Sequence, residues 1–156
     1  MEAQELEPVR SVVIPTGSLP LVVPSAAVAE VAGFSEITPL PITAPGLVGV
    51  FQWRGVSVPV VAFETLLGQP APRPDRRSKV VIFYPLPGRP RSDFFGILAG
   101  ADPQSRMIGS DQIRQADVPT AVSNRFIAAT FDFDGNTVGI PDLPAIRESI
   151  RRDGGS

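Results

Sequence analysis

Pro39–Gly68 reads PLPITAPGLVGVFQWRGVSVPVVAFETLLG and carries the clearest structural pattern in the chain. Two apolar runs, 47–53 and 56–61, flank an Arg-Gly dipeptide, and apolar runs around a short glycine-containing turn predict a β-hairpin. A helical turn is predicted over 63–67, so the hairpin has a defined exit direction. The tip therefore displays one charged side chain, Arg54, on largely apolar strands.

Short apolar runs separated by turn residues continue on both sides of this hairpin. The chain has 18 Pro and 14 Gly among 156 residues, which exceeds ordinary usage. Because these residues are spread between the apolar runs, they predict turns between short strands and not disorder. Further strands are predicted at 9–15, 19–23, 28–32, 36–41, 80–84, 94–99, 126–133 and 136–140, with shorter ones near 107–108 and 112–113. Asp134-Gly135 is the strongest hairpin turn signal, and Asp142 is expected to cap a final helix through Arg151.

The most linker-like segment is 69–77, QPAPRPDRR, with three prolines, three arginines and no large apolar side chain. We therefore expect one domain over residues 9–151, with approximate subdomains at 9–68 and 78–151 and flexible termini at 1–8 and 152–156. Each subdomain ends in a hairpin, a proline and a short helix, which suggests two similar β units. Short strands at this spacing are typical of an all-β fold built from small antiparallel barrels.

Composition excludes most catalytic chemistry. The chain contains no Cys and no His, which removes thiol nucleophiles and Cys-ligated metals together with the commonest general base and metal ligand. The sequence also lacks the nucleophile and phosphate-loop motifs of common enzyme classes. We therefore predict that the protein is not an enzyme and needs no metal or cofactor.

Charge and hydropathy set further limits on the class of protein. The net charge of −2 disfavours a protein that grips nucleic acid, which normally carries a basic excess. The alternative that stays open is a small β-barrel that binds nucleic acid through arginine-rich loops at 73–91. No apolar run approaches the ~20 residues of a membrane span, and the acidic segment 1–7 does not resemble a signal peptide. We expect no membrane insertion and a cytoplasmic location.

The central hairpin resembles a family signature. Residues 47–61, LVGVFQWRGVSVPVV, resemble the G-v-x-n-l-R-G-x-x-x-P-v-v-d-l pattern of the CheW-like domain, a family that includes the chemotaxis coupling protein and the regulatory domain of the CheA histidine kinase. Weaker matches follow the family order at 28–31 (VAEV), 38–41 (TPLP), 94–98 (FFGIL), 126–128 (FIA) and 139–143 (GIPDL). The Trp53-Arg54-Gly55 variant and the Phe63-Glu64 pair are more similar to the divergent ChpC-type adaptors of type IV pilus chemosensory systems.

The resemblance implies a fold and a role. The fold is two five-stranded, SH3-like barrels packed on a shared apolar core, with short helices after the barrel hairpins. The role is that of a non-catalytic adaptor between the cytoplasmic tip of a methyl-accepting chemoreceptor and a CheA-type histidine kinase. For the pilus-type variants, the implied output is twitching motility.

The resemblance also implies which residues contact each partner. The family's receptor-binding positions carry over to Val28, Gly49 and Arg54, near the groove between the barrels. Its kinase-binding positions carry over to Glu30 and Val31. The sequence leaves open whether Trp53 is a core residue or part of the interface.

Overall fold

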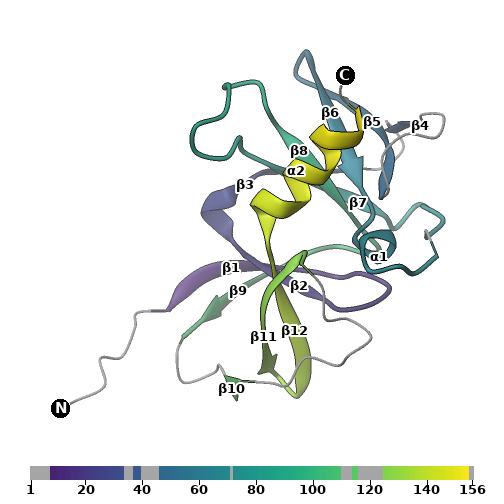
Figure 1. The fold of residues 1–156 in the computed structure, drawn as a ribbon. Coiled ribbons are helices and arrows are strands. Elements are labelled where there is room, and N and C mark those ends of the chain that lie inside the picture. Colours follow the sequence, from purple (N-terminus) through teal and green to yellow (C-terminus); the bar gives the residue numbers. More distant parts are fainter. Residues whose placement is uncertain are drawn as a thin grey trace.

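The computed structural model describes residues 8–33, 37–39, 46–70, 72–109, 114–115 and 125–154. These residues form two sheets and three short or medium helices (Figure 1). Sheet A has the order β10 (Arg114–Gln115), β11 (Ile127–Phe133), β12 (Asn136–Pro141), β2 (Leu21–Pro24), β1 (Val9–Ile14) and β9 (Gln104–Ile108). Sheet B has the order β3 (Val28–Gly33), β7 (Lys79–Phe83), β8 (Phe95–Ala99), β6 (Val56–Val61), β5 (Leu47–Trp53) and β4 (Ile37–Pro39). The helices are η1 (Ser25–Ala27, 3-10), α1 (Phe63–Leu66) and α2 (Leu143–Gly154).

The prediction of a mainly β fold with short helices after the hairpins is confirmed. Each sheet has five strands of four residues or more and one shorter strand, β10 or β4, at its edge. The expected antiparallel pairing holds for the hairpins but not for every pair of strands. The pairs β2–β12 and β6–β8 are parallel, and each joins strands of two different hairpins. The predicted strand near 112–113 falls outside the described residues.

The two halves of the chain do not correspond to the two sheets. Sheet A takes β1 and β2 from before residues 69–77 and β9 to β12 from after them, and sheet B likewise draws strands from both sides. The expected boundary at 69–77 therefore does not separate the sheets. The physical reason is that turn chemistry specifies individual hairpins, whereas the pairing of one hairpin with another depends on long-range contacts. At the C-terminus, α2 continues to Gly154, three residues beyond its expected end.

The suggested similarity between two β units is nevertheless present in the structure. The order β4-β5-β6-β8-β7-β3 in sheet B matches β10-β11-β12-β2-β1-β9 in sheet A, and a helix follows both β6 and β12. Both hairpins close with two residues of positive φ, at 49° and 80° for Arg54-Gly55 and at 53° and 78° for Asp134-Gly135. Positive φ at both central residues defines a type I′ turn, whose twist matches that of the strands.

Among the described residues, one apolar cluster joins the two sheets, and two further clusters each lie within a single sheet. Alternation along a strand sends successive side chains into different clusters. Val81 and Phe83 of β7 enter the core shared by both sheets, whereas Val80 and Ile82 enter a second cluster confined to sheet B. The shared core also contains the stacked pair Phe83–Phe95, with ring centroids 5.2 Å apart. Helix α2 contributes two side chains to the shared core as it runs along sheet B (Figure 1). A third, smaller cluster lies within sheet A.

A buried carboxylate adds a polar link between the two sheets. Glu64 of α1 is 5% exposed, and its Oε2 accepts a hydrogen bond of 2.5 Å from the backbone N–H of Gly17 in the β1–β2 turn. Gly17 leaves room for this approach, because a Cβ there would lie 3.1 Å from the same oxygen. Glu64, which follows β6 of sheet B, thus anchors the β1–β2 turn of sheet A.

Candidate functional site

Arg54 occupies a backbone conformation that disfavours it. Its φ of 49° lies in the left-handed region, which costs a residue with a Cβ about 1–2 kcal/mol. Asn, Asp and Gly are the usual residues at this position of a type I′ turn, and the matching turn of sheet A has Asp134 there. Arg54 is therefore a local exception that the turn itself does not require.

The Arg54 side chain forms an ion pair across sheet B. Its Nη2 donates to Oε1 of Glu30 at 3.1 Å, and the two side chains are 72% and 38% exposed. Pairs this exposed contribute only about 0–1 kcal/mol to stability. The guanidinium also lies over the ring of Trp53, 4.9 Å from its centroid. The geometry thus holds a solvent-exposed cation on an aromatic face at the hairpin tip.

The ion pair joins strands that are distant in the sheet order. Glu30 lies on the terminal strand β3, and β7 and β8 separate β3 from the β5–β6 hairpin. The contact therefore requires sheet B to curl until its first strand meets the hairpin tip. It also brings into contact two residues that the resemblance assigned to different partners.

The two faces of β3 group the predicted residues differently from their assignment to receptor and kinase. Val28 lies opposite Phe83 and Val31 opposite Val81, two residues of the shared core, whereas Glu30 lies opposite Ile82 of the sheet B cluster. Glu30 and Val31 therefore point to opposite faces of their strand. Val31 is exposed because β3 is the edge of the sheet.

Two further predicted residues, Gly49 and Trp53, are buried. Gly49 is buried within β5, between β4 and β6. Trp53 is only 8% exposed and belongs to the sheet B cluster, so its body is a core residue whose face supports Arg54. The expected position of Arg54 near a groove between the barrels stays a prediction. Among the described residues, its contacts with Trp53 and Glu30 both lie in sheet B.

Two aromatic residues beside Trp53 are not among the predicted site residues. Phe94 packs edge-on against Trp53, with centroids 4.8 Å apart and planes at 64°, and Tyr84 lies 6.2 Å from Phe94. Tyr84 is 49% exposed. Both residues flank the segment 85–93, which lies between the predicted strands at 80–84 and 94–99, and the paired aromatics at 83–84 and 94–95 are the signal in the sequence that could identify them. We call Glu30, Trp53, Arg54, Tyr84 and Phe94 the Arg54 surface.

A charged cluster lies next to Phe94 in the chain. Asp93 Oδ2 accepts hydrogen bonds of 2.9 Å from Nε of Arg89 and from Nε of Arg147 in α2, and Arg147 Nη2 donates to Oδ1. Asp93 is only 11% exposed. Burial by itself raises the pKa of this carboxyl group, but the hydrogen bonds from Arg147 and Arg89, with their charges, outweigh it. The pKa of Asp93 therefore lies below its ordinary value.

This lowered pKa predicts how stability depends on pH. A carboxyl group with a depressed folded-state pKa stabilises the protein above its unfolded pKa, about 3.9 for Asp. The contribution is lost as the pH falls through the folded value. We expect the Asp93 contribution to the free energy of unfolding to be constant from pH 8 to 5 and to fall below about pH 4. Urea unfolding of the wild type and Asp93→Asn at pH 7 and pH 3 measures this. The difference between the two proteins should shrink at pH 3, and a difference that grows there would contradict the assignment.

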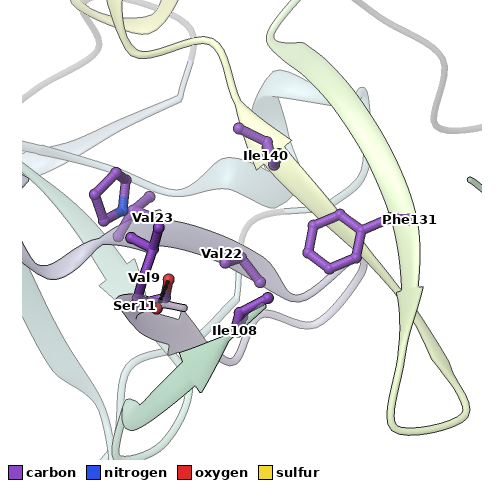
Figure 2. Close-up of a pocket in the computed structure, with 8 residues that line it drawn as sticks. Val9, Ser11, Val22, Val23, Ile108, Phe131 and Ile140 are labelled. Carbon is purple, nitrogen blue, oxygen red and sulfur yellow. Dashed lines mark hydrogen bonds between the residues drawn. The ribbon is translucent and has the colours of Figure 1, made fainter. Parts of the chain in front are cut away.

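An apolar cavity of about 180 Å³ lies in sheet A, away from the Arg54 surface (Figure 2). Its described lining comes from β1, β2, β9, β11 and β12, and Ser11 is the one polar side chain among these residues. The Ser11 hydroxyl already donates to the carbonyl oxygen of Val9 at 3.1 Å. The lining that the structure describes therefore offers apolar contact and no acid, base or metal ligand.

The arginine-rich loops do not form one surface. Residues 72–78 precede β7 and residues 84–94 follow it, so the two loops lie at opposite ends of one strand. Arg89 is already paired with Asp93. A continuous basic track for a nucleic-acid backbone would need these charges side by side. Among the described residues, no helix combines the length and apolar character needed to cross a membrane.

Comparisons with known proteins agree with this architecture. A family model described as the CheW-like domain matches residues 10–151. The chain is 23% identical to the chemotaxis protein CheW of Rhizobium meliloti (strain 1021) over 128 residues, which cover 81% of this chain and 79% of that protein. It is also similar to the crystal structure of the scaffolding protein TtCheW from Thermoanaerobacter tengcongensis. The TM-score is 0.71 and the identity 20%, over 92% of this chain and 90% of that one.

Proposed function

Because this chain belongs to the CheW-like domain family, a family of non-catalytic chemotaxis scaffolds, we propose that it couples a methyl-accepting chemoreceptor to a CheA-type histidine kinase in the cytoplasm. The chain would do so by binding and not by chemistry. It contains no His and no Cys. The Arg54 surface, in contrast, has the residue types that dominate protein–protein contacts, Arg, Trp and Tyr.

The observation that carries this proposal is an exposed arginine whose contacts do little more than offset its unfavourable backbone conformation. The left-handed backbone costs about 1–2 kcal/mol. The ion pair, with 72% and 38% exposed side chains, returns about 0–1 kcal/mol, and the contact with the Trp53 ring returns about 0.5–1 kcal/mol. Local exceptions of this kind occur mainly at functional sites. Arg54 is therefore better explained by a contact with a partner than by the stability of the fold.

The assignment of partners to residues is part of the proposal. Arg54 and Val28 are proposed to contact the receptor, and Glu30 and Val31 the kinase regulatory domain. Since Glu30 holds Arg54 directly, occupation of one partner site would alter the other through this ion pair. Gly49, which is buried, is proposed to act only by shaping β5.

Co-sedimentation tests the two partners separately. The cytoplasmic signalling fragment of a receptor and the regulatory domain of the kinase, both from the source organism, would each be mixed with the purified chain. Binding of both supports the adaptor role. Binding of a labelled oligonucleotide in low salt, with neither protein bound, would favour the arginine-rich-loop alternative instead.

A charge swap separates the role of the ion pair from the role of Arg54 itself. Glu30→Lys places two cations together, so we expect binding of the kinase domain to fall more than binding of the receptor fragment. Glu30→Arg combined with Arg54→Glu restores the pair in the reverse order. We expect this double variant to fold normally and still to fail in receptor binding, measured by co-sedimentation. Recovery of receptor binding would show that only the ion pair matters.

We further propose that the output is twitching motility, on the basis of the Trp53-Arg54-Gly55 variant. The Trp53 ring carries Arg54 and contacts Phe94, so this variant changes the surface presented to a partner. Deletion of the gene should then abolish twitching and spare flagellar swimming. The opposite pattern would assign the chain to a flagellar system.

A further inference from the structure

The segment between β7 and β8 connects the C-terminal helix to the Arg54 surface. Its last two residues before β8 are Asp93 and Phe94, adjacent in the chain, so the position of one constrains the other. Asp93 is bound on one side by Arg147 of α2 and on the other by Arg89 of its own segment. Phe94 lies against Trp53, whose ring also contacts Arg54.

The charged cluster is one of the anchors of this segment. Backbone hydrogen bonds of 3.0 Å, from Arg89 N to Leu86 O and from Asp93 N to Pro90 O, form two turns within it. Leu86 packs against the shared core, and the Arg147 contact ties the Asp93 end of the segment to α2 over 54 residues of sequence separation. Among the described residues, Nη1 of Arg147 is buried without an acceptor, so this guanidinium depends on Asp93 for its hydrogen bonds.

We propose that Asp93 is a positioning residue that fixes Phe94 and Tyr84 as the aromatic part of the Arg54 surface, which the receptor then contacts. The contact with the receptor rests on the adaptor function proposed above. The positioning of the two rings by Asp93 does not depend on that function. Tyr84 is the exposed end of the aromatic series and Phe94 its half-buried middle. The C-terminal helix therefore acts on the hairpin tip through a bidentate ion pair and one aromatic contact.

The chain supplies its own reporters for this test. Trp53 is the single tryptophan and Tyr84 the single tyrosine among 156 residues. Tryptophan emission and near-ultraviolet circular dichroism therefore report on the Arg54 surface without labelling. We expect Asp93→Asn to shift the Trp53 emission to longer wavelength and to weaken the near-ultraviolet signal, while the far-ultraviolet spectrum stays unchanged.

Matched variants separate positioning from general damage. Asp102→Asn makes the same change at a 76% exposed aspartate paired with Lys79, and it should leave the Trp53 signals unaltered. Arg147→Met removes the α2 side of the contact and should reproduce the effect of Asp93→Asn. If Asp93→Asn does not fold, Arg147→Met decides the question alone. Unchanged Trp53 signals in the folded variants would overturn the positioning role.

Binding then tests the contact role. Asp93→Asn and Phe94→Leu should each weaken binding to the receptor fragment roughly tenfold. Their double variant should lose little more, because they act through one contact. Tyr84→Ala should weaken binding while the Trp53 emission stays unchanged. If these variants bind as the wild type does, the contact role is wrong. If the wild type binds neither partner, the adaptor function fails, and the spectra still decide the positioning role.

Discussion

Arg54→Glu is expected to abolish receptor binding while the protein stays folded. The side chain is 72% exposed and its ion pair with Glu30 is weak, so the free energy of unfolding should change by less than about 1 kcal/mol. An arginine at the centre of an interface typically contributes about 2 kcal/mol or more, which corresponds to roughly a 30-fold change in dissociation constant. Charge reversal adds repulsion to this loss. Titration of the receptor fragment against both proteins measures the effect.

The control for this variant is the same substitution in the other sheet. Arg10 is exposed on β1 of sheet A, and Arg10→Glu changes the net charge by the same amount. It should bind the receptor fragment as the wild type does. Equal losses in both variants would mean that overall charge, and not the hairpin tip, governs binding. Wild-type affinity in Arg54→Glu would remove Arg54 from the receptor site.

Phe83→Ala should have the largest effect on stability. Phe83 is fully buried in the core shared by the two sheets and stacks on Phe95. Truncation of a buried phenylalanine typically lowers the free energy of unfolding by about 3–5 kcal/mol. Because the same core joins both sheets, they should lose stability together and unfold in one transition. Urea unfolding followed by Trp53 emission and by far-ultraviolet circular dichroism should give one common midpoint.

Met107→Ala is the matched control for this truncation. Met107 is a large apolar residue in a strand, but it is 49% exposed, so its loss should cost less than about 0.5 kcal/mol. Trp53 reports on sheet B, whereas the far-ultraviolet signal reports on both sheets. Two separate midpoints in Phe83→Ala would show that the sheets are independent units and that the shared core is not their main connection.

The sequence was sufficient for the local elements of this protein. The Arg-Gly and Asp-Gly dipeptides between apolar runs predict both hairpins, because short glycine-containing turns between apolar runs favour this connection. The structure shows that both turns are of type I′. Asp142 caps α2 as expected, with its Oδ1 accepting from the N–H of Ala145 at 3.0 Å. The order of the family-like motifs also predicts a CheW-like domain, which the match over residues 10–151 confirms.

Only the tertiary structure decided how these elements combine into a surface. Hairpin chemistry does not say that β2 pairs with β12 or β8 with β6, so it does not predict that each sheet takes strands from both sides of 69–77. Nor does it say which face of β3 carries Glu30, because the irregular pairing between Val28 and Glu30 shifts the alternation. The contact between Arg54 and Glu30 spans 24 residues, and that between Asp93 and Arg147 spans 54. Such contacts depend on the curl of a sheet and the docking of a helix, which arise from burial of apolar side chains across the whole chain and leave no local pattern in the sequence.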